Sequence, residues 1–477
     1  MRNAPSSWMT LSSLRAFFFG KDEKMKIVKQ LSADCVTPVS LYFRLSGESK
    51  CLLESIPRDS ESNRYSLLAF DPVHHIQFMD GEFQIDHHRY TCEDPLKELE
   101  KYVLKDERIE GLPFEGGAIG YVGYDIAAMY EELGRIPEDV LGLPDMQFYL
   151  FETFVIYDHQ KQTLSIVASD LYSQCGKTQL DRRIQRIETE IFQLQAAENQ
   201  PLEPIKLTFT SNFTQDEYEA IVERAKQYIR EGDLFQVVPS QRLTADFPVD
   251  PFQYYRHLRV TNPSAYLYFL PFSDVTVIGS SPESLVRVKG NTVTTNPIAG
   301  TRRRGTNEIE DDHLAEELLA DEKEIAEHQM LIDLGRNDIG KVSEIGSVHV
   351  PLFMTIERYR FVMHIVSLVE GKLRKDQTAM DALKATLPAG TVSGAPKIRA
   401  MTRIYEWEPV KRSIYAGAVG YLSCDNQADF AIAIRTMVVK DQQAHVQAGG
   451  GVVYDSNPTS EYQETLQKAK ALLEVGK

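Results

Sequence analysis

The chain has 477 residues, of which 43% are hydrophobic and 25% charged, a composition typical of a globular protein with one large core or two to three domains. Its formal net charge of -17 at pH 7 argues against general affinity for nucleic acid or an anionic membrane surface. No apolar run is long enough to span a membrane, and five scattered cysteines without a Cys-x-x-Cys pair predict reduced thiols and a cytoplasmic location.

The N-terminal part is expected to consist mainly of strands. Residues 1–24 lack a signal-peptide cleavage site, so we predict a disordered extension there. From Val36 to about Asp170, short apolar runs alternate with turn residues, which indicates strands with few helices. Leu52–Ser55 and Arg64–Pro72 are expected to be neighbouring strands, whereas Asp94–Val103 is expected to be helical.

A polar stretch rich in proline, Glu198–Pro204, is the best linker in the sequence. It divides the chain into an N-terminal region, 25–200, and a C-terminal domain, 205–477. The string Gly117–Val122 in the first part echoes Gly417–Leu422 in the second. Six matching positions do not establish a duplication, but they indicate that both parts contribute similar antiparallel strands.

The second part mixes strands with separate helices, which favours an α+β architecture over a βαβ repeat. Thr214–Glu231 begins with a capping box and should be a helix. Asp233–Pro239 is predicted to be a buried strand, His313–Leu334 the longest helix, and Pro388–Pro396 a loop. Further strands and hairpin turns are expected near Gly290, Asp425 and Asp441, and Thr178–Ala197 should form a charged helix.

The stretch Gln447–Lys468 predicts a strand, a glycine turn, an N-cap and a helix. Gly449, Gly450 and Gly451 permit positive φ or a close approach of backbone, and Asn457-Pro458 is a typical helix start. On the helix, helical spacing predicts a buried stripe of Tyr462, Leu466, Ala469 and Leu473.

Two carboxylate pairs could bind a metal ion. Glu324 and Glu327 lie three residues apart on one predicted helix, as do Glu461 and Glu464 on another. Facing pairs of this kind would offer the oxygen ligands that Mg²⁺ prefers. Spacing alone, however, favours the simpler interpretation of two solvated helix faces.

Four further side chains stand out because they interrupt apolar runs or end strands. Gln236 needs hydrogen-bond partners, as a structural amide or as a group that orients a reactant. Glu283 ends a strand, where burial can raise its pKa enough for a general acid. Arg435 calls for a carboxylate partner if it faces inward. His364 alone is more typical of a satisfied core residue than of a catalyst.

Taken together, these segments resemble the chorismate-utilising enzymes, and most closely the large subunit of anthranilate synthase. The resemblance is strong over about residues 210–475 and weaker over about 36–170. The matching strings are Pro297–Arg302, Glu327–Asp338, Val362–Ser367, Gly390–Lys397, Ile434–Thr436, and Gln447–Gly451 continuing through Glu464.

The resemblance implies antiparallel sheets packed as a sandwich with helices outside, and Mg²⁺-dependent conversion of chorismate and ammonia to anthranilate and pyruvate. It implies magnesium ligands at Glu327 and Glu464, a proton donor for the leaving hydroxyl at Glu283, and a role for His364 in pyruvate elimination. The remaining implied site residues are the catalytic Gln236 and Thr391 and the chorismate contacts Gly300, Thr301, Tyr415, Arg435, Gly449, Gly450 and Gly451.

Two positions separate the relatives. Isochorismate and salicylate synthases carry a water-activating lysine where this chain has Gln236, so ammonia is favoured as the nucleophile. Many aminodeoxychorismate synthases carry a covalent lysine where Ala299 stands, although some lack it. Aminodeoxychorismate synthase therefore stays the alternative activity. A second alternative is a non-catalytic amino-acid-sensing relative. The presence of both carboxylate pairs, Glu283 and Arg435 argues against that second alternative.

The resemblance also implies feedback inhibition by tryptophan. Leu52–Ser55 resembles part of the family's tryptophan site, with Ser55 completed by Ala265, Tyr266 and Leu267, where relatives commonly have Pro-Tyr-Met. Arg303 stands where relatives usually have proline. Because the sequence has no glutaminase nucleophile motif, the expected partner in a hetero-oligomer is a separate glutamine amidotransferase subunit.

Overall fold

A computed structural model describes residues 24–55, 64–103, 112–195, 201–359 and 362–476. The predicted extension, 1–24, thus lies outside the described residues except for Lys24. None of the helices in these ranges combines the length and apolarity needed to cross a bilayer.

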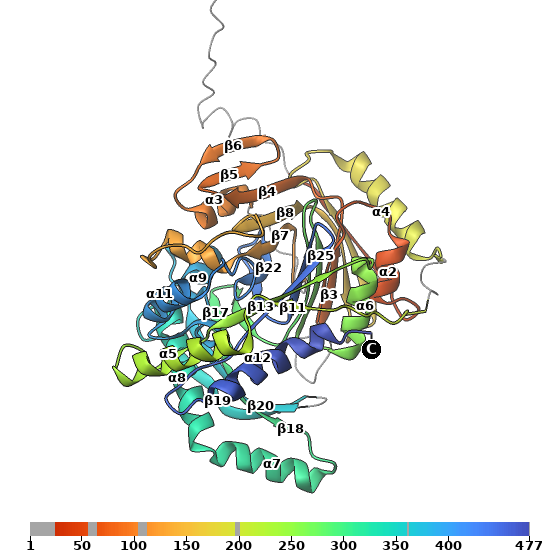
Figure 1. The fold of residues 1–477 in the computed structure, drawn as a ribbon. Helices are drawn as coiled ribbons and strands as arrows, with labels where there is room; N and C mark the ends of the chain where they lie inside the picture. The colour runs from red at the N-terminus through yellow and green to blue at the C-terminus, as the bar shows by residue number, and fades with distance from the viewer. Residues whose placement is uncertain (1–23, 56–63, 104–111, 196–200, 360–361, 477) are drawn as a thin grey trace, which may run out of the picture.

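Two large antiparallel sheets dominate the architecture (Figure 1). The first has 11 strands, and each pairs with its neighbours in an antiparallel manner. Its strands, in spatial order, are β1 (Lys26–Ser32), β10 (Thr163–Ser169), β9 (Thr153–Asp158), β3 (Tyr65–Ala69), β2 (Cys51–Glu54), β14 (Tyr266–Pro271), β15 (Thr276–Ser281), β24 (Thr436–Lys440), β25 (Gln443–Gly449), β13 (Ser240–Asp246) and β11 (Thr210–Ser211).

The second sheet has 12 strands, with β19 (His349–Arg358) paired to β20 beside the main path. A separate two-stranded piece joins β12 (Gln236–Val237) to β21 (Gly394–Ala395). In spatial order the main path runs β18 (Ile298–Arg303), β20 (Val362–Lys372), β17 (Thr292–Thr295), β16 (Ser284–Lys289), β23 (Ala428–Ile432), β22 (Ala418–Ser423), β7 (Gly117–Val122), β8 (Met146–Phe151), β4 (His74–Met79), β5 (Glu82–Ile85) and β6 (His88–Thr91).

Helices cover the outer faces of the sheets (Figure 1), and a core of side chains from both sheets fills the space between them. The predicted α+β sandwich is therefore confirmed. Tyr149 of the second sheet, for example, stacks on Phe272 beside the first at 4.9 Å between ring centroids. The helices are α2 (Pro38–Arg44), α3 (Pro95–Tyr102), η2 (Tyr124–Met129), α4 (Lys177–Ile191), α5 (Gln215–Arg230), α6 (Pro251–Thr261), α7 (Glu308–Ala320), α8 (Glu322–Gly340), α9 (Ala379–Thr386), α10 (Gly390–Ser393), α11 (Lys397–Trp407) and α12 (Pro458–Leu473).

Both sheets contain strands from both parts of the sequence. In the first sheet β2 pairs with β14, and in the second β7 pairs with β22. The two echoing strings are thus direct neighbours, with Gly120 opposite Gly420. A Cβ on either glycine would meet a backbone oxygen of the next strand at 2.0 Å, so close packing explains the shared glycines. The predicted division at residues 200–205 stays a prediction.

Local sequence signals place most helix starts correctly. Thr214 caps α5 with the predicted capping box to Glu217, and Asp94 caps α3 by accepting from the Lys97 amide. Asn457 does the same for α12, where Ser460 N donates to its side chain at 3.0 Å. Helix α4 ends at Ile191, six residues short of the predicted end at Ala197.

The predicted helix His313–Leu334 is wrong as one element, because the chain breaks at Asp321. This residue is extended, ends α7 and caps α8 through Lys323 N and Glu324 N, at 3.1 and 3.2 Å. Its carboxylate also receives Arg302 at 2.9 Å. A side chain that satisfies two free amides and a guanidinium stabilises the break despite good helix formers on both sides.

Three shorter predictions also need correction. The strand predicted over Asp233–Pro239 is reduced to β12, because β21 offers only two pairing residues and Pro239 has no amide hydrogen. The predicted loop Pro388–Pro396 contains α10 and β21. On α12 the residues buried most deeply are Glu461, Thr465, Ala469 and Leu472, so the predicted stripe is displaced by one position at most sites.

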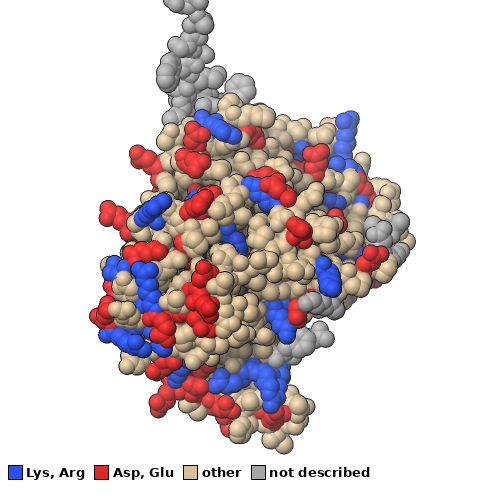
Figure 2. All heavy atoms as spheres, in the orientation of Figure 1, with Lys and Arg blue, Asp and Glu red and all other residues tan. Residues whose placement is uncertain are grey.

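The arginine run Arg302–Arg304, at the end of β18, is neutralised by ion pairs with nearby acids. Arg303 pairs with Glu310 at 2.5 Å and Arg304 with Asp311 at 2.8 Å. Figure 2 shows acidic and basic side chains interspersed on this face, including over α7 at the bottom. The run therefore does not form a continuous basic surface for nucleic acid.

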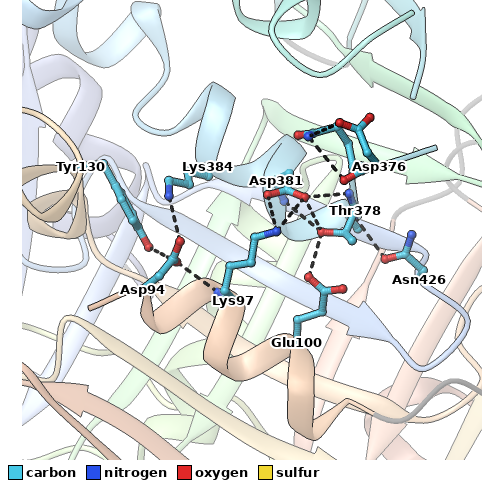
Figure 3. Close-up of polar contacts among 11 residues, drawn as sticks. Asp94, Lys97, Glu100, Tyr130, Asp376, Thr378, Asp381, Lys384 and Asn426 are labelled. Carbon is cyan, nitrogen blue, oxygen red and sulfur yellow. Dashed lines mark hydrogen bonds and ion pairs between the residues drawn. The ribbon is translucent and has the colours of Figure 1, made fainter. Parts of the chain in front are cut away.

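A polar seam joins α3 to α9 and so connects the two parts of the chain (Figure 3). Asp94 receives Lys384 and Tyr130, each at 2.9 Å, and Lys97 pairs with Asp381 at 3.3 Å. We call this contact the α3–α9 seam; its other members are Glu100, which accepts from Thr378, and Asn426, which accepts from the Ala379 amide.

Candidate functional site

A cleft of about 2360 Å³ opens beside α8, α10 and α12 and is lined by strands of both sheets. Of the residues predicted for a site, the lining includes Gln236, Glu283, Gly300, Thr301, Glu327, His364, Thr391, Tyr415, Arg435, Gly449, Gly451 and Glu464. Segments that are up to about 230 residues apart in the sequence therefore meet in one cleft.

The glycines after β25 form a wall of the cleft through close approach of the backbone. A Cβ on Gly449 would lie 2.7 Å from Pro239 O and 3.0 Å from the Tyr415 hydroxyl. A Cβ on Gly451 would lie 3.0 Å from the Gln236 amide nitrogen. None of Gly449, Gly450 or Gly451 has a positive φ, so of the two predicted reasons for glycine only close packing applies.

Gln236 and Glu327 meet across the cleft. The Gln236 amide donates to Glu327 Oε1 at 3.0 Å, while its own carbonyl oxygen is buried without a hydrogen-bond partner. Burial raises the pKa of Glu327, and the Glu324 charge adds to this, whereas Gln236 and Lys468 oppose it. Gln236 thus orients a carboxylate of the site and retains one acceptor for a ligand.

The opposite carboxylate pair lies on α12. Glu461 is buried, its Oε2 has no partner, and burial raises its pKa. Glu464 is half exposed and pairs with Lys468 at 2.7 Å, and Lys468 Nζ also donates to Gly449 O at 3.1 Å. Lys468 thus partly balances the carboxylate charge in this part of the cleft.

The carboxylates supply the oxygen donors that a hard divalent cation requires. Glu461 is buried and Glu327 is half-buried, and neither forms an ion pair within the described residues, which favours binding of a cation between the helices. No three acidic, histidine or cysteine side chains of the described chain are close enough to form a complete metal site by themselves. The donor chemistry therefore fits a magnesium ion that takes its remaining ligands from water and substrate.

Glu283 lies at the β15–β16 turn, where its carbonyl accepts from Ile432 N at 3.0 Å and fixes the backbone. Burial raises the pKa of its carboxyl to about 8, and the nearby Thr391 side chain and the Lys468 charge oppose that shift. At neutral pH the carboxyl is therefore mostly protonated and can donate a proton to a group bound in the cleft.

Thr391 reaches the cleft from the first turn of α10, and its hydroxyl is buried without a hydrogen-bond partner. The loop is fixed from behind, since Ser393 Oγ donates to Ala389 O at 2.7 Å and Arg412 donates to Val392 O at 2.8 Å. A fixed loop with a free hydroxyl is suited to hydrogen bonding with a ligand.

Arg435 lies at the edge of β24 with a left-handed backbone, φ 50°, and its carbonyl accepts from Ser280 N at 3.0 Å. Burial lowers the pKa of its guanidinium, and the neighbouring Tyr415 opposes the shift. Within the described part of the chain no carboxylate forms an ion pair with it. The carboxylate partner that its inward position requires must then come from a ligand.

Gly300 lies at a β-bulge of β18, where the register with β20 shifts between Ala299 and Thr301. The bulge brings Thr301 Oγ1 and Gly300 O each to 3.0 Å from His364 Nδ1. His364 therefore belongs to the cleft and not to the core, against the simpler interpretation of a lone histidine in an apolar run.

One buried group behind the cleft was missed by sequence reasoning. The Arg412 side chain is 1% exposed and pairs with Glu408 at 2.6 Å. It donates to Val238 O at 2.6 Å and to Val392 O, and its guanidinium lies over Tyr415, 5.5 Å from the ring centroid. Arg412 thereby connects the segments that carry Gln236, Thr391 and Tyr415. The only signal in the sequence was an acid and a base four residues apart.

The residues predicted for a regulatory site also come together. Strand β2 pairs with β14 so that Glu54 lies opposite Leu267, and Ser55 follows at the position beside Tyr266. The Tyr266 hydroxyl donates to Asp429 at 2.9 Å, while Ala265 and Tyr266 line the same cleft. Leu267 is buried in the sheet, and Ser55 borders residues 56–63, which lie outside the described ranges.

Comparison with known proteins connects this arrangement to one family. The family model for chorismate binding enzymes matches residues 48–474. Anthranilate synthase component 1 of Lactococcus lactis subsp. lactis is 54% identical over 455 residues, which cover 95% of this chain and 100% of that protein. The crystal structure of anthranilate synthase component I from Streptococcus pneumoniae TIGR4 superimposes with a TM-score of 0.82 at 48% identity and covers 93% of this chain and 99% of that one. The menaquinone-specific isochorismate synthase of Escherichia coli shares the fold, with a TM-score of 0.70 at 19% identity over 97% of this chain and 98% of that one.

Proposed function

The chain belongs to the family of chorismate-binding enzymes, with anthranilate synthase component 1 proteins among its relatives, and on that premise we propose that it converts chorismate and ammonia to anthranilate and pyruvate. The observation that carries the proposal is Glu283, a buried carboxyl with a pKa of about 8 in a cleft that Arg435 also lines. Chorismate is a dicarboxylate with a hydroxyl that must leave, so it needs both a cation and an acid.

In the first half-reaction, the ammonia nitrogen bonds to ring carbon C2 and the bond from C4 to its hydroxyl breaks. Glu283 donates its proton to the leaving oxygen, which departs as water, and the nitrogen loses one proton to become a neutral amine. Gln236 directs its amide to Glu327 and leaves its carbonyl oxygen available to accept from the incoming nitrogen.

In the second half-reaction, the proton on C2 is removed and the ether bond to the enolpyruvyl group breaks. Pyruvate leaves and the ring becomes aromatic. His364, held at Nδ1 by Thr301 and Gly300, is placed to take part in this proton transfer. Arg435 and the glycine wall at Gly449 hold a carboxylate and keep the ring in position.

Glu327 and Glu464 would hold a magnesium ion, with the free oxygen of Glu461 nearby, and the ion when bound offsets the negative charge of the substrate carboxylates. The protein is acidic overall, so this local positive charge matters for binding a dianion. Tryptophan is the proposed inhibitor at Ser55, Ala265 and Tyr266, and a glutamine amidotransferase is the proposed source of ammonia.

The alternative product, aminodeoxychorismate, is less well supported. Ala299 lines the cleft at the position where a covalent lysine would reach the ring, and its methyl group cannot form an adduct. The test is to incubate the purified chain with chorismate, an ammonium salt and Mg²⁺ and to identify the products. Anthranilate and pyruvate in equal amounts support the proposal, whereas an amino product formed without pyruvate contradicts it.

A further inference from the structure

The loop that carries Thr391 begins and ends at one buried ammonium group. Lys397, the first residue of α11, donates through Nζ to the carbonyl oxygen of Thr386, the last residue of α9, at 3.1 Å. The same ammonium pairs with the carboxylate of Asp338 in the last turn of α8. We call residues 386–397 the Thr391 loop. Lys397 therefore joins the two ends of this loop and also ties the loop to α8.

Both members of the ion pair are shielded from water. The Lys397 side chain is 12% exposed and the Asp338 side chain 8%. Burial lowers the pKa of the Lys397 ammonium, and the Asp338 charge opposes that shift. A buried charge that loses its partner is strongly unfavourable, so the lysine cannot leave Asp338 at little cost. The contact is thus a fixed connection, unlike an exchangeable pair on the surface.

Helix formation does not explain where these two charges lie. Asp338 is close to the carboxyl end of α8, and Lys397 is the first residue of α11. An acid at the carboxyl end of a helix and a base at the amino end are each disfavoured by the helix dipole. The pair is therefore best explained by the connection that it makes between α8 and the Thr391 loop.

The Thr391 loop packs directly on α8. A Cβ on Gly390 would lie 2.6 Å from Leu334 Cδ1 of that helix. The next residue, Thr391, lines the cleft, and its buried hydroxyl has no hydrogen-bond partner. Lys397 and Asp338 do not line the cleft themselves. Any effect of the lysine on the reacting groups must therefore act through the loop.

We propose that Lys397 is a positioning residue for Thr391: it fixes the Thr391 loop on α8 and so sets where the Thr391 hydroxyl lies in the cleft. The inference rests on the proposed function, in which Glu283 protonates the leaving oxygen of chorismate. Thr391 lies close to that acid, since its side chain is among the groups that act on the pKa of Glu283. A displacement of about 1 Å at a reacting group can cost about 100-fold in rate, so a residue that holds the loop affects turnover without touching the substrate.

The first test measures kcat and KM of Lys397→Met with chorismate, an ammonium salt and Mg²⁺. Methionine fills similar space but makes neither bond, so kcat should fall about 10- to 100-fold. The KM for chorismate should change by less than about threefold, because the Thr391 hydroxyl acts beside the proton donor and the substrate contact at Arg435 is unaltered. Lys397→Arg keeps the charge toward Asp338 and should recover part of the loss in kcat.

The matched control is Lys341→Met. Lys341 pairs with the same carboxylate of Asp338, at 3.3 Å, but its side chain is 52% exposed. It follows the last residue of α8 and is not part of the Thr391 loop. The control removes a positive partner of Asp338 without releasing the loop, so kcat and KM should both stay within about twofold.

A double-mutant cycle separates positioning from a general loosening of the structure. In Thr391→Val the hydroxyl is absent, so Lys397 has no hydroxyl left to position. Lys397→Met added to Thr391→Val should therefore lower kcat by less than about a further twofold, because residues that act through one another are not additive. A fall equal to the product of the two single effects would show that Lys397 acts elsewhere and would overturn the proposal.

Amide hydrogen exchange measures the loop itself, independently of activity. The amide of Val392 donates to Ala389 O at 3.3 Å, and the amide of Gly394 donates to Gly390 O. Both amides should exchange at least about tenfold faster in the lysine-to-methionine variant at the loop, and at an unchanged rate in the control.

If Lys397→Met does not fold, Asp338→Asn combined with Lys397→Met serves in its place, because it removes the same connection without leaving a lone buried charge. Full kcat or unchanged exchange in a folded variant contradicts the proposal. If the unmodified chain makes no anthranilate from chorismate and ammonia, the proposed function fails, whereas the exchange comparison still decides whether Lys397 fixes the loop.

Discussion

The cleft and the α3–α9 seam are both polar, and both join distant parts of the sequence. They differ in whether their buried polar groups have hydrogen-bond partners within the protein. In the seam Asp94 accepts from Lys97 N, Tyr130 and Lys384, and Thr378 donates to Glu100. In the cleft the carbonyl oxygen of Gln236 and the Thr391 hydroxyl are buried without partners. Because buried polar groups in folded proteins are nearly always hydrogen-bonded, the unsatisfied ones indicate where a ligand binds.

The difference also appears in the charges. In the seam Asp94 pairs with Lys384 and Asp381 with Lys97. Burial opposes ionisation of Asp94, but hydrogen bonds from Lys384, Lys97 N and Tyr130 lower its pKa overall. In the cleft burial raises the pKa of Glu283 and Glu327. Polar networks in which every group has a partner stabilise a structure, whereas acids whose pKa is shifted by burial are typical of sites that perform chemistry.

The largest expected effect is that of Glu283→Gln in the cleft. The amide fills the same space but has no proton to give, so kcat with ammonia should fall about 100-fold or more. Folding should not be weakened, because the charge on a buried carboxylate is unfavourable. Measurement of kcat and of thermal unfolding at pH 9 tests both parts; a variant that keeps most of its turnover would remove Glu283 from the mechanism.

The next largest effect should come from Arg412→Met. This variant tests whether the buried hydrogen bonds of Arg412 hold the segments that line the cleft in place. Removing one member of a buried ion pair leaves Glu408 without its partner and should lower the free energy of unfolding by about 3–5 kcal/mol. Urea unfolding measures this. Arg412→Lys should recover part of the stability but not the bonds to both Val238 and Val392, so its KM for chorismate should stay raised.

The pH dependence follows from the pKa of Glu283. The acid form is the active form, so the rate at constant free ammonia should be level below pH 8 and fall about tenfold per pH unit above it. For stability, the folded pKa of about 8 lies above the ordinary 4.5, so the contribution is complete below pH 4.5 and is lost as pH rises toward 8. In Glu283→Gln this part of the pH dependence of unfolding should disappear; its persistence would assign it to other groups.

The smallest effect should be found in the seam. Asp94→Ala removes an N-cap and the contacts to Lys384 and Tyr130, and should lower the free energy of unfolding by about 1 kcal/mol. The kcat and KM for chorismate should not change, since none of these residues lines the cleft. A change in either would show that the seam is coupled to the site.

Local signals predicted much of the fold because they act over a few residues. The capping box at Thr214, the N-cap at Asn457 and the strand pair of β2 and β3 were all found from sequence. The break at Asp321 was missed because good helix formers continue on both sides of it. Asp321 caps α8 and also pairs with Arg302 of β18, a contact that local sequence does not reveal.

Some residues of the site were predicted and others were missed, because short sequence signals do not reveal contacts between distant segments. Family resemblance placed Glu283, Thr391 and Arg435, and the structure brings them into one cleft, although their roles stay predictions. Arg412 carries no periodicity and no motif of its own, so its importance appears only when Val238, Val392 and Tyr415 are seen around one guanidinium. The role of Arg412 depends on contacts between segments that are distant in the sequence.

The pairing of β2 with β14 and of β7 with β22 also has a consequence for folding during translation. When the first 250 residues have emerged, β2 and β7 are complete but each has one open edge, because their partners begin at Tyr266 and Ala418. An open edge can pair with strands of other chains, and long-range pairing is slow to form. The nascent chain must keep two such edges unpaired until most of its length has been translated.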